Sequence, residues 1–182
     1  MPMVYVYKPG AGSWSVLATH GPAPASRASH SAVLYKDTLI MFGGALHTAT
    51  REGLAGLEGR AGEVSNEVWT LSLGSLHPAW TNATPAACKH KHNYHKRCGG
   101  LSVSGHSAVV VEMGAARQPV MLVFFGHSPH YGYLHIVQEY YIEENTWSIA
   151  QTAGWSARAG FGHSAVRDPL SDKIYVHGGL VS

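Results

Sequence analysis

The chain is poor in charge, since Asp, Glu, Lys and Arg make up 13% of its 182 residues and the net charge is +2. So small a net positive charge does not indicate a nucleic-acid partner, because binding to phosphate groups depends on many Lys and Arg side chains. No stretch approaches 18 consecutive apolar residues, so direct membrane insertion of this segment is not expected. The opening residues MPMVYVYKPG lack a charged region followed by an apolar one, which is not the pattern of a signal peptide.

Motifs for common catalytic chemistries are missing as well. The sequence contains no Gly-x-Ser-x-Gly, no His-Glu-x-x-His, no glycine-rich phosphate loop before a Lys and no Gly-x-Gly-x-x-Gly. The sequence therefore predicts no catalytic residues and no cofactor.

Internal repetition is the main feature that the sequence does have. His-Ser-Ala-Val occurs three times, beginning at His30, His106 and His163, and each copy is followed by a turn, an apolar run and then Gly-Gly or Gly-His. An identity of this length in three copies indicates a repeat architecture. The histidines are expected to hydrogen-bond backbone within or between repeats, because a residue present in every unit argues against a single active site.

A second half-unit alternates with the first. Val, Tyr and Trp occupy equal offsets in VYVYKPGAGSW (4–14) and VQEYYIEENTW (137–147), and NEVWTLSLGSLHPAW (66–80) is a looser copy. The three tryptophans that end these segments are 66 and 67 residues apart. The predicted structural positions of the whole motif are His30, Gly43, Gly44, Trp80, His106, Gly126, Trp147, His163, Gly178 and Gly179.

Each unit is predicted to form four strands. Ser31–Tyr35 leads to Thr38–Phe42 through a connection of hairpin length, and Val68–Leu73 with a short strand at Trp80 completes the set. Continuous apolar runs such as VMLVFF (120–125) indicate strands that are buried on both faces. The glycine-interrupted stretch 51–63 is expected to be a loop.

Tandem four-stranded sheets, with a double glycine after the second strand and a Trp in the last, are typical of a kelch-type β-propeller. The predicted fold is all-β, a partial propeller of about three four-stranded blades, two complete and flanked by partial ones. The expected boundaries are 1–20 for the end of one blade, 26–80 for the second, 81–100 for an insert, 101–150 for the third and 157–182 for the start of a fourth.

A closed propeller of this type needs more blades, and an isolated piece would expose a sheet edge at each end. The chain is therefore expected to be a fragment whose partners include the remaining blades of a parent protein. Closure by dimerisation is the alternative.

Residues 105–180 resemble the kelch propeller of attractin and attractin-like proteins. The features that carry the resemblance are VMLVFFGHSPHYGY, then VQEY and NTWS, then YVHGG. The resemblance implies a non-enzymatic protein-interaction module, in the extracellular part of a single-pass membrane protein or in a secreted one. A role in cell–cell interaction or in modulation of receptor signalling, with protein partners of unknown identity, is implied in the same way.

The stretch CKHKHNYHKRC, residues 88–98, holds both cysteines of the chain. For an extracellular chain the resemblance implies a disulfide between Cys88 and Cys98, worth about 3 kcal/mol on the chain-entropy model. A partner in a longer protein and two free thiols both stay open. His90, His92 and His95 are weak metal candidates, because the cysteine spacing is wide and four cationic neighbours oppose a divalent ion.

Other surface features remain open to more than one interpretation. Asn82 begins an Asn-Ala-Thr glycosylation acceptor, although an unmodified Asn in a turn is the alternative. Binding is expected at the inserts 45–65 and 81–100, and secondarily at an aromatic loop, where local packing between blades is the alternative. The side chains that would carry binding in that loop are His127, Tyr131 and Tyr133.

Two other classes of function compete with the interaction module. One is a metalloenzyme on a propeller scaffold, and the other is a cytosolic kelch adaptor of a ubiquitin ligase. The nearest acidic pair, Glu143 and Glu144, is expected in a solvated turn rather than in acid–base catalysis.

Overall fold

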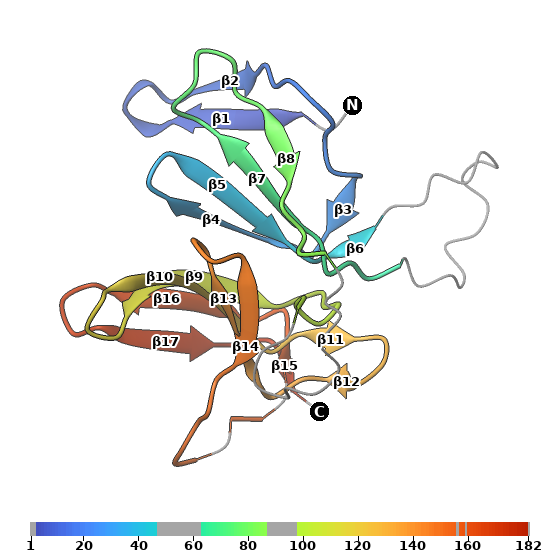
Figure 1. The fold of residues 1–182 in the computed structure, drawn as a ribbon, viewed down its shortest axis with the longest axis vertical. Helices are drawn as coiled ribbons and strands as arrows, with labels where there is room; N and C mark the ends of the chain where they lie inside the picture. Colours follow the sequence, from blue (N-terminus) through green and yellow to red (C-terminus); the bar gives the residue numbers. More distant parts are fainter. Residues whose placement is uncertain (1–2, 47–62, 87–97, 156, 159, 182) are drawn as a thin grey trace.

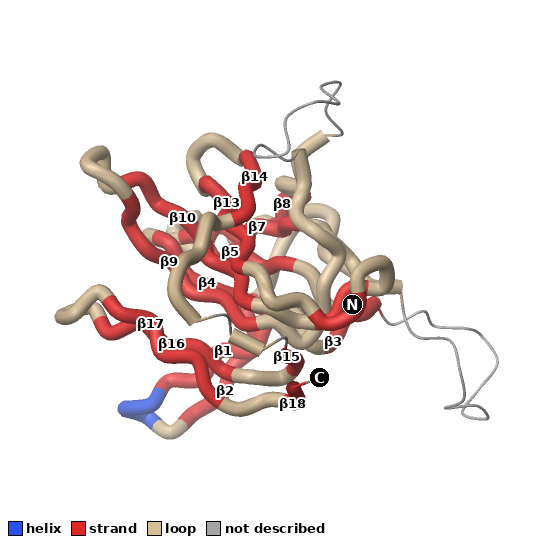
Figure 2. Tube along the Cα trace, turned by 90° about the horizontal axis from the view of Figure 1, so that it is seen from below, coloured by secondary structure: helices blue, strands red, loops and turns tan. Residues whose placement is uncertain are grey.

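A computed structural model describes residues 3–46, 63–86, 98–155, 157–158 and 160–181 (Figure 1). Its regular structure is almost wholly β. A single 3₁₀ turn, Pro9–Ala11, is the one helical element in these ranges and is blue in Figure 2. Accordingly, the described part of the chain has no helix that could span a membrane. The loop predicted at 51–63 lies outside these ranges except for its last residue.

Two four-stranded antiparallel sheets are flanked by two hairpins. The strand order is β4-β5-β7-β8 in the first sheet and β14-β13-β10-β9 in the second. The first hairpin is β1 (Val4–Lys8) with β2 (Ser13–Leu17), and the first sheet holds β4 (Ser31–Tyr35), β5 (Thr38–Phe42), β7 (Val68–Ser72) and β8 (Trp80–Asn82). The second sheet holds β9 (Ser107–Met113), β10 (Gln118–Phe124), β13 (Val137–Tyr141) and β14 (Thr146–Ile149), and the last hairpin is β16 (Ser164–Asp168) with β17 (Lys173–His177).

This arrangement confirms the predicted partial propeller. Figure 1 shows the units stacked in chain order, from the first hairpin at the top to the last hairpin below. The first strands of successive units lie against one another, β4 on β9 and β9 on β16. The predicted hairpin through Lys36 and Asp37 is also confirmed, since β4 pairs with β5 from Tyr35↔Thr38 to Ser31↔Phe42.

Three short strand pairs lie at one end of the sheets, together with isolated bridges. They are β3 (Arg27–Ala28) with β6 (Ala45–Leu46), β11 (His127–Ser128) with β12 (Gly132–Tyr133), and β15 (Gly160–Phe161) with β18 (Leu180–Val181). The second complete sheet has a bridge of Ser104 to His127 in the place where the others have β3–β6 and β15–β18. This end of the molecule therefore carries the connections from which a binding surface can be built.

The core lies between the units rather than on one face of a single sheet. The largest cluster joins the two complete sheets and contains Ile40, Phe42, Val68, Leu101, Val103, Met121, Val123, Leu134, Tyr140 and Trp147. A second cluster joins the first hairpin to the first sheet, and a third joins the second sheet to the last hairpin. Strands such as β10 are buried on both faces, as the continuous apolar run predicted.

The strand register shows which residues of the three repeats occupy equivalent positions. Phe42, Phe124 and His177 are equivalent, because each pairs with the serine of its own His-Ser-Ala-Val copy. The residues after them are therefore Gly43–Gly44, Phe125–Gly126 and Gly178–Gly179, and all six have positive φ. The prediction that Gly126-His127 replaces the double glycine was wrong by one position, because Phe125 takes the left-handed conformation (φ 54°) in place of the first glycine.

Candidate functional site

The β11–β12 hairpin, residues 127–133, is fixed to the body of the protein at both ends. Ser104 and His127 exchange backbone hydrogen bonds of 3.0 and 2.8 Å, and the Leu134 N–H donates to the Gly126 carbonyl at 2.8 Å. Leu134 is buried in the largest core cluster. The hairpin is therefore held in one position relative to the sheets.

The side chains of this hairpin differ in exposure. Tyr131 is 64% exposed and Tyr133 is 43% exposed. The His127 ring packs edge-on against Tyr133, with ring centroids 5.1 Å apart, and His130 lies near Tyr131 in a similar arrangement. Two tyrosines on a fixed hairpin form an amphipathic surface of the kind that anchors protein partners.

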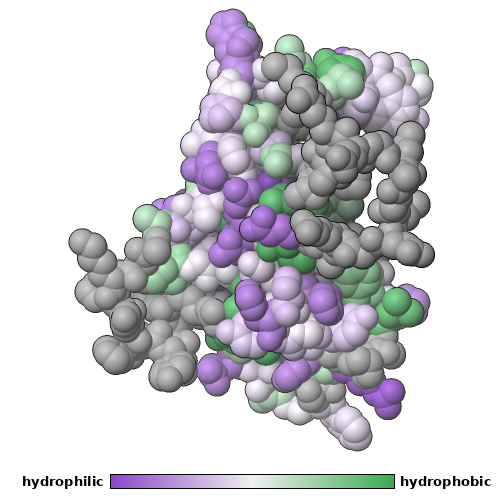
Figure 3. Space-filling model, turned by 90° about the vertical axis from the view of Figure 1, so that its right-hand side faces the viewer, coloured by the Kyte–Doolittle hydropathy of each residue, from purple (hydrophilic) through white to green (hydrophobic). Residues whose placement is uncertain are grey.

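A cavity of about 680 Å³ opens beside this hairpin. Its lining residues are Ala45, Glu63, Val64, Ser102, Ser104, His127, Pro129 and His130. Figure 3 views the side of the molecule that carries these loops and shows polar residues interspersed with small apolar patches. Throughout the described ranges there is no cluster of three or more His, Cys, Asp or Glu side chains that could hold a metal ion.

The predicted acidic pair lies in the turn between β13 and β14, and its two carboxylates have different partners. Glu143 accepts a hydrogen bond from the Tyr35 hydroxyl at 3.3 Å and lies 3.6 Å from the Lys36 ammonium. Glu144 accepts hydrogen bonds from Gln118 and from Thr146. The pair is not arranged around a shared reacting group, which acid–base catalysis would require.

Two of the three repeat histidines, His106 and His163, are buried, whereas His30 is exposed. His106 is 6% exposed, and its Nε2 lies 2.8 Å from the Ser31 hydroxyl of the neighbouring sheet. Burial, with smaller contributions from His163 and His30, lowers the pKa of His106 to about 3. Burial also lowers the pKa of His163 and of His30. His106 and His163 are therefore neutral parts of the packing at pH 7.

Acid is expected to destabilise the chain through the buried His106. His106 stays neutral in the folded state down to a pKa of about 3, whereas in the unfolded chain it takes up a proton near pH 6.5. Its contribution to stability is thus complete above pH 6.5 and is lost as the pH falls from there toward 3. Urea unfolding at pH 7 and pH 5 should differ by about 2 kcal/mol from this residue alone. Equal unfolding free energies at the two pH values would show that His106 is not buried in its neutral form.

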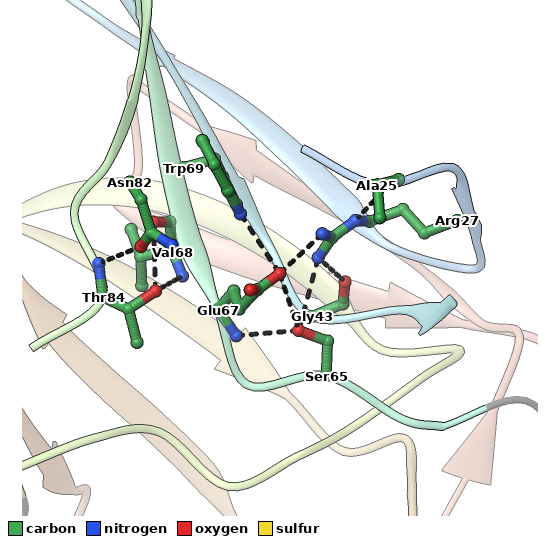
Figure 4. Close-up of polar contacts among 9 residues, drawn as sticks. All are labelled: Ala25, Arg27, Gly43, Ser65, Glu67, Val68, Trp69, Asn82 and Thr84. Atoms are coloured by element: carbon green, nitrogen blue, oxygen red, sulfur yellow. Dashed lines mark hydrogen bonds and ion pairs between the residues drawn. The ribbon is translucent and has the colours of Figure 1, made fainter. Parts of the chain in front are cut away.

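A partly buried ion pair joins β3 to the start of β7 (Figure 4). The Arg27 side chain is 2% exposed and donates to Glu67 at 2.7 Å and to the Gly43 carbonyl at 3.0 Å. Burial alone would raise the pKa of Glu67, but hydrogen bonds from Arg27 and Trp69 lower it. The ion pair was not predicted from the sequence. The one local feature that marks Arg27 is its position three residues before the first repeat histidine. Every donor here is used within the fold, so the pair is structural.

The glycosylation acceptor Asn82 is exposed and ends strand β8, whereas a loop was predicted. Its Oδ1 accepts a hydrogen bond from the Thr84 N–H at 2.9 Å, which continues the strand into a turn. The Thr84 hydroxyl also accepts a hydrogen bond from the Val68 N–H of β7 at 3.1 Å (Figure 4). Modification of Asn82 stays a prediction.

Several predicted site residues lie outside the described ranges. They are Cys88, His90, His92 and His95, together with most of the inserts 45–65 and 81–100. Cys98 is within the described ranges, at the start of the segment that leads into the second sheet. The disulfide strap and the weak metal candidates therefore stay predictions.

Comparison with known proteins decides the family. The family model described as the attractin/LZTR1 β-propeller matches residues 1–182. The chain belongs to the attractin/LZTR1 β-propeller family. This confirms the resemblance that the repeat motifs indicated.

Among curated relatives, "Putative protein tag-53" of Caenorhabditis elegans is 32% identical over 177 residues, which cover 96% of this chain and 12% of that protein. "Multiple epidermal growth factor-like domains protein 8" of Mus musculus is 28% identical over 163 residues, covering 88% of this chain and 5% of that protein. The human protein of the same name is likewise 28% identical, over 171 residues that make up 92% of this chain and 5% of that protein. The chain thus spans a small part of each of these relatives.

One solved structure, titled "Structure of YjhT", matches with a TM-score of 0.53 and 18% sequence identity. The match covers 87% of this chain and 36% of that chain. At this level of identity the likeness extends to the fold alone. The attractin/LZTR1 family assignment rests on the sequence match.

Proposed function

We propose that the chain is a non-enzymatic protein-interaction module, exposed outside the cell as part of a larger attractin-like propeller protein. Its role there is in cell–cell contact or in modulation of receptor signalling, and the remaining blades of the parent protein are its structural partners. Family membership and the small share of each relative that the chain spans support this reading. The observation that carries it is the fixed β11–β12 hairpin, with Tyr131 and Tyr133 exposed beside a cavity.

The arrangement of side chains around the β11–β12 hairpin favours binding of a partner over catalysis. In the described ranges the hairpin brings aromatic rings and histidines together, while the paired carboxylates lie on a different turn. Tyrosines on a fixed backbone lose little conformational entropy when a partner covers them, so each can contribute strongly to affinity. A peptide or loop that seats a side chain in the cavity and packs on the tyrosines is the expected kind of ligand.

The Cys88–Cys98 strap and a glycan on Asn82 belong to the same proposal, because both are expected of an extracellular chain. Mass analysis of non-reduced peptides from secreted protein should show Cys88 joined to Cys98. Two free thiols in the secreted protein would contradict the strap.

Selection from a displayed peptide library against the immobilised 182-residue chain tests the binding function. Peptides enriched on the wild-type chain should lose binding to a Tyr131→Ala/Tyr133→Ala variant, because most of their contact area is removed. They should keep binding to Leu170→Ala, which removes an apolar side chain that is 96% exposed on the turn between β16 and β17. Peptides insensitive to the tyrosine variant would argue against this surface. Stoichiometric copper or zinc that depends on His90, His92 and His95 would instead favour a metalloenzyme.

A further inference from the structure

The cavity beside the β11–β12 hairpin has walls of different chemistry. Glu63 and Val64 come from the first complete unit, whereas His127 and His130 come from the second. Among the described residues that line the cavity Glu63 is the one acid, and they include no Lys or Arg. The described lining therefore presents a carboxylate but no basic side chain that would pair with it.

The backbone on both walls of the cavity is held in place. The Leu46 N–H donates to the Glu63 carbonyl at 2.8 Å, and Val64 forms an antiparallel bridge with Ala45. On the other wall the hairpin is held by the two hydrogen bonds that His127 exchanges with the first complete segment of its own unit, at Ser104. A partner that enters the cavity thus meets walls whose backbone is already ordered, which reduces the entropic cost of binding.

The cation on the neighbouring strand is already used inside the fold. Arg27 lies on β3, which pairs with β6, and its guanidinium donates to Glu67 at 2.7 Å and to the Gly43 carbonyl at 3.0 Å (Figure 4). Turning Arg27 toward Glu63 would leave the partly buried Glu67 without its partner, which is costly. The Glu63 carboxylate is therefore available to a cation from a binding partner.

The rest of the lining suits a long basic side chain. Ala45, Val64 and Pro129 provide apolar contacts for an aliphatic stem. The hydroxyls of Ser102 and Ser104 are acceptors for further hydrogen bonds from a cationic head. The cavity volume of about 680 Å³ lies within the usual range of ligand sites.

Arginine fits this lining better than lysine does. A guanidinium has five N–H donors and binds a carboxylate through two parallel hydrogen bonds, so it can reach Glu63 and the serine hydroxyls together. It is also more weakly hydrated than an ammonium, and so loses less on entering a cavity with apolar walls. Tyr131 and Tyr133, exposed on the hairpin, then remain for the residues that flank the arginine.

We propose that this surface recognises an arginine of a partner protein, whose guanidinium pairs with Glu63 while the flanking residues pack on Tyr131 and Tyr133. This inference rests on the proposed function of the β11–β12 hairpin and names the residue that the cavity selects. An acidic side chain in the cavity would face the like charge of Glu63. The same carboxylate therefore rejects acidic segments, which gives specificity as well as affinity.

Peptides selected on the immobilised 182-residue chain test the inference from the side of the ligand. Peptides whose binding depends on Tyr131 and Tyr133 should share an arginine at one position. Replacing that arginine by glutamine in a synthetic peptide should weaken binding at least tenfold, and replacing it by lysine should weaken binding by a smaller factor. These substitutions leave the protein itself unchanged, so they do not depend on the folding of a variant.

Variants of the chain test the same contact from the side of the protein. Glu63→Gln should weaken the arginine peptide at least tenfold, whereas Glu144→Gln should leave its affinity unchanged. Glu144→Gln is the matched control, because it removes the same charge on the turn between β13 and β14. A fresh selection on Glu63→Lys should enrich Asp or Glu in place of the arginine. Circular dichroism checks that each variant is folded.

The outcomes separate this inference from the proposed function. Tyrosine-dependent peptides that lack a common arginine, or that share an acidic residue instead, would overturn the inference and leave the hairpin as a protein-binding surface. Equal affinity of the arginine peptide for the wild-type and Glu63→Gln chains would overturn it as well. A selection that yields no tyrosine-dependent peptide would contradict the proposed function, and this inference with it.

Discussion

Trp147→Ala is expected to destabilise the chain by about 3–5 kcal/mol, the range for removing a large buried aromatic. Trp147 is 1% exposed and lies between the two complete sheets, with its ring 4.6 Å from Phe42 and 4.9 Å from Tyr140. Gly100 lies directly on it, since a Cβ added there would come within 3.0 Å of the Trp147 ring. Neighbours held this closely cannot collapse into the cavity, which keeps the cost at the upper end.

Trp14→Ala is the matched control, because Trp14 holds the same position in its own unit but is 70% exposed. This change should cost less than about 0.5 kcal/mol, as is usual for surface sites. Urea unfolding followed by circular dichroism measures both variants. Similar losses for the two substitutions would mean that the blades do not pack on one another as described.

Gly44→Ala is expected to cost about 3 kcal/mol or more. Gly44 has φ of 90°, and an added Cβ would lie 2.8 Å from both the Ala28 carbonyl oxygen and the His30 Cβ. The left-handed conformation alone costs an L-residue about 1–2 kcal/mol, and the contact with backbone adds to it. The change should also separate β3 from β6, since β3 ends at Ala28 and β6 begins at Ala45, both beside this position.

Gly114→Ala separates the two contributions. Gly114 also has positive φ, at 69°, but an added Cβ would meet nothing within 4 Å. Its cost should therefore be limited to the conformational part, about 1 kcal/mol. Thermal unfolding of both variants provides the measurement. A Gly44→Ala variant no less stable than Gly114→Ala would refute the close approach at the second glycine of the motif.

Much of the fold could be predicted because the repeat makes the sequence redundant. The strands Ser31–Tyr35 and Thr38–Phe42 follow from apolar runs around a two-residue connection, and the buried faces follow from the absence of alternation. The register of the third copy of the motif then follows from the first. The family could be recognised for the same reason, since the match extends through residues 1–182.

The exception at the double glycine could not be predicted from residue types. Phe125 holds a left-handed conformation with φ of 54° where the first glycine is usual. At Gly43 a Cβ would lie 2.7 Å from the Val103 carbonyl oxygen. Gly160 takes the place of Val103 in the third unit and also offers its carbonyl, to the Gly126 N–H, so nothing in the residue types accounts for Phe125. The sequence alone aligns Gly126-His127 with Gly-Gly. The strand register shows that Phe125-Gly126 is the equivalent pair.

The candidate sites depend on contacts between distant segments, which a single sequence does not specify. Nothing local indicates that Arg27 is 2% exposed and paired with Glu67, 40 residues away. The exposure of Trp14 likewise depends on which neighbouring unit is present rather than on its own motif. The hairpin at 127–133 was predicted as an aromatic loop, but its cavity depends on Glu63 and Val64 from the first complete unit.

The affinity of a selected peptide for wild-type and variant chains tests the central claim most directly, namely that the β11–β12 hairpin is a protein-binding surface. Calorimetric titration should show binding weakened at least tenfold by Tyr131→Ala/Tyr133→Ala, about 1.4 kcal/mol or more, and unchanged by Leu170→Ala. Equal affinities for all three chains would contradict the claim.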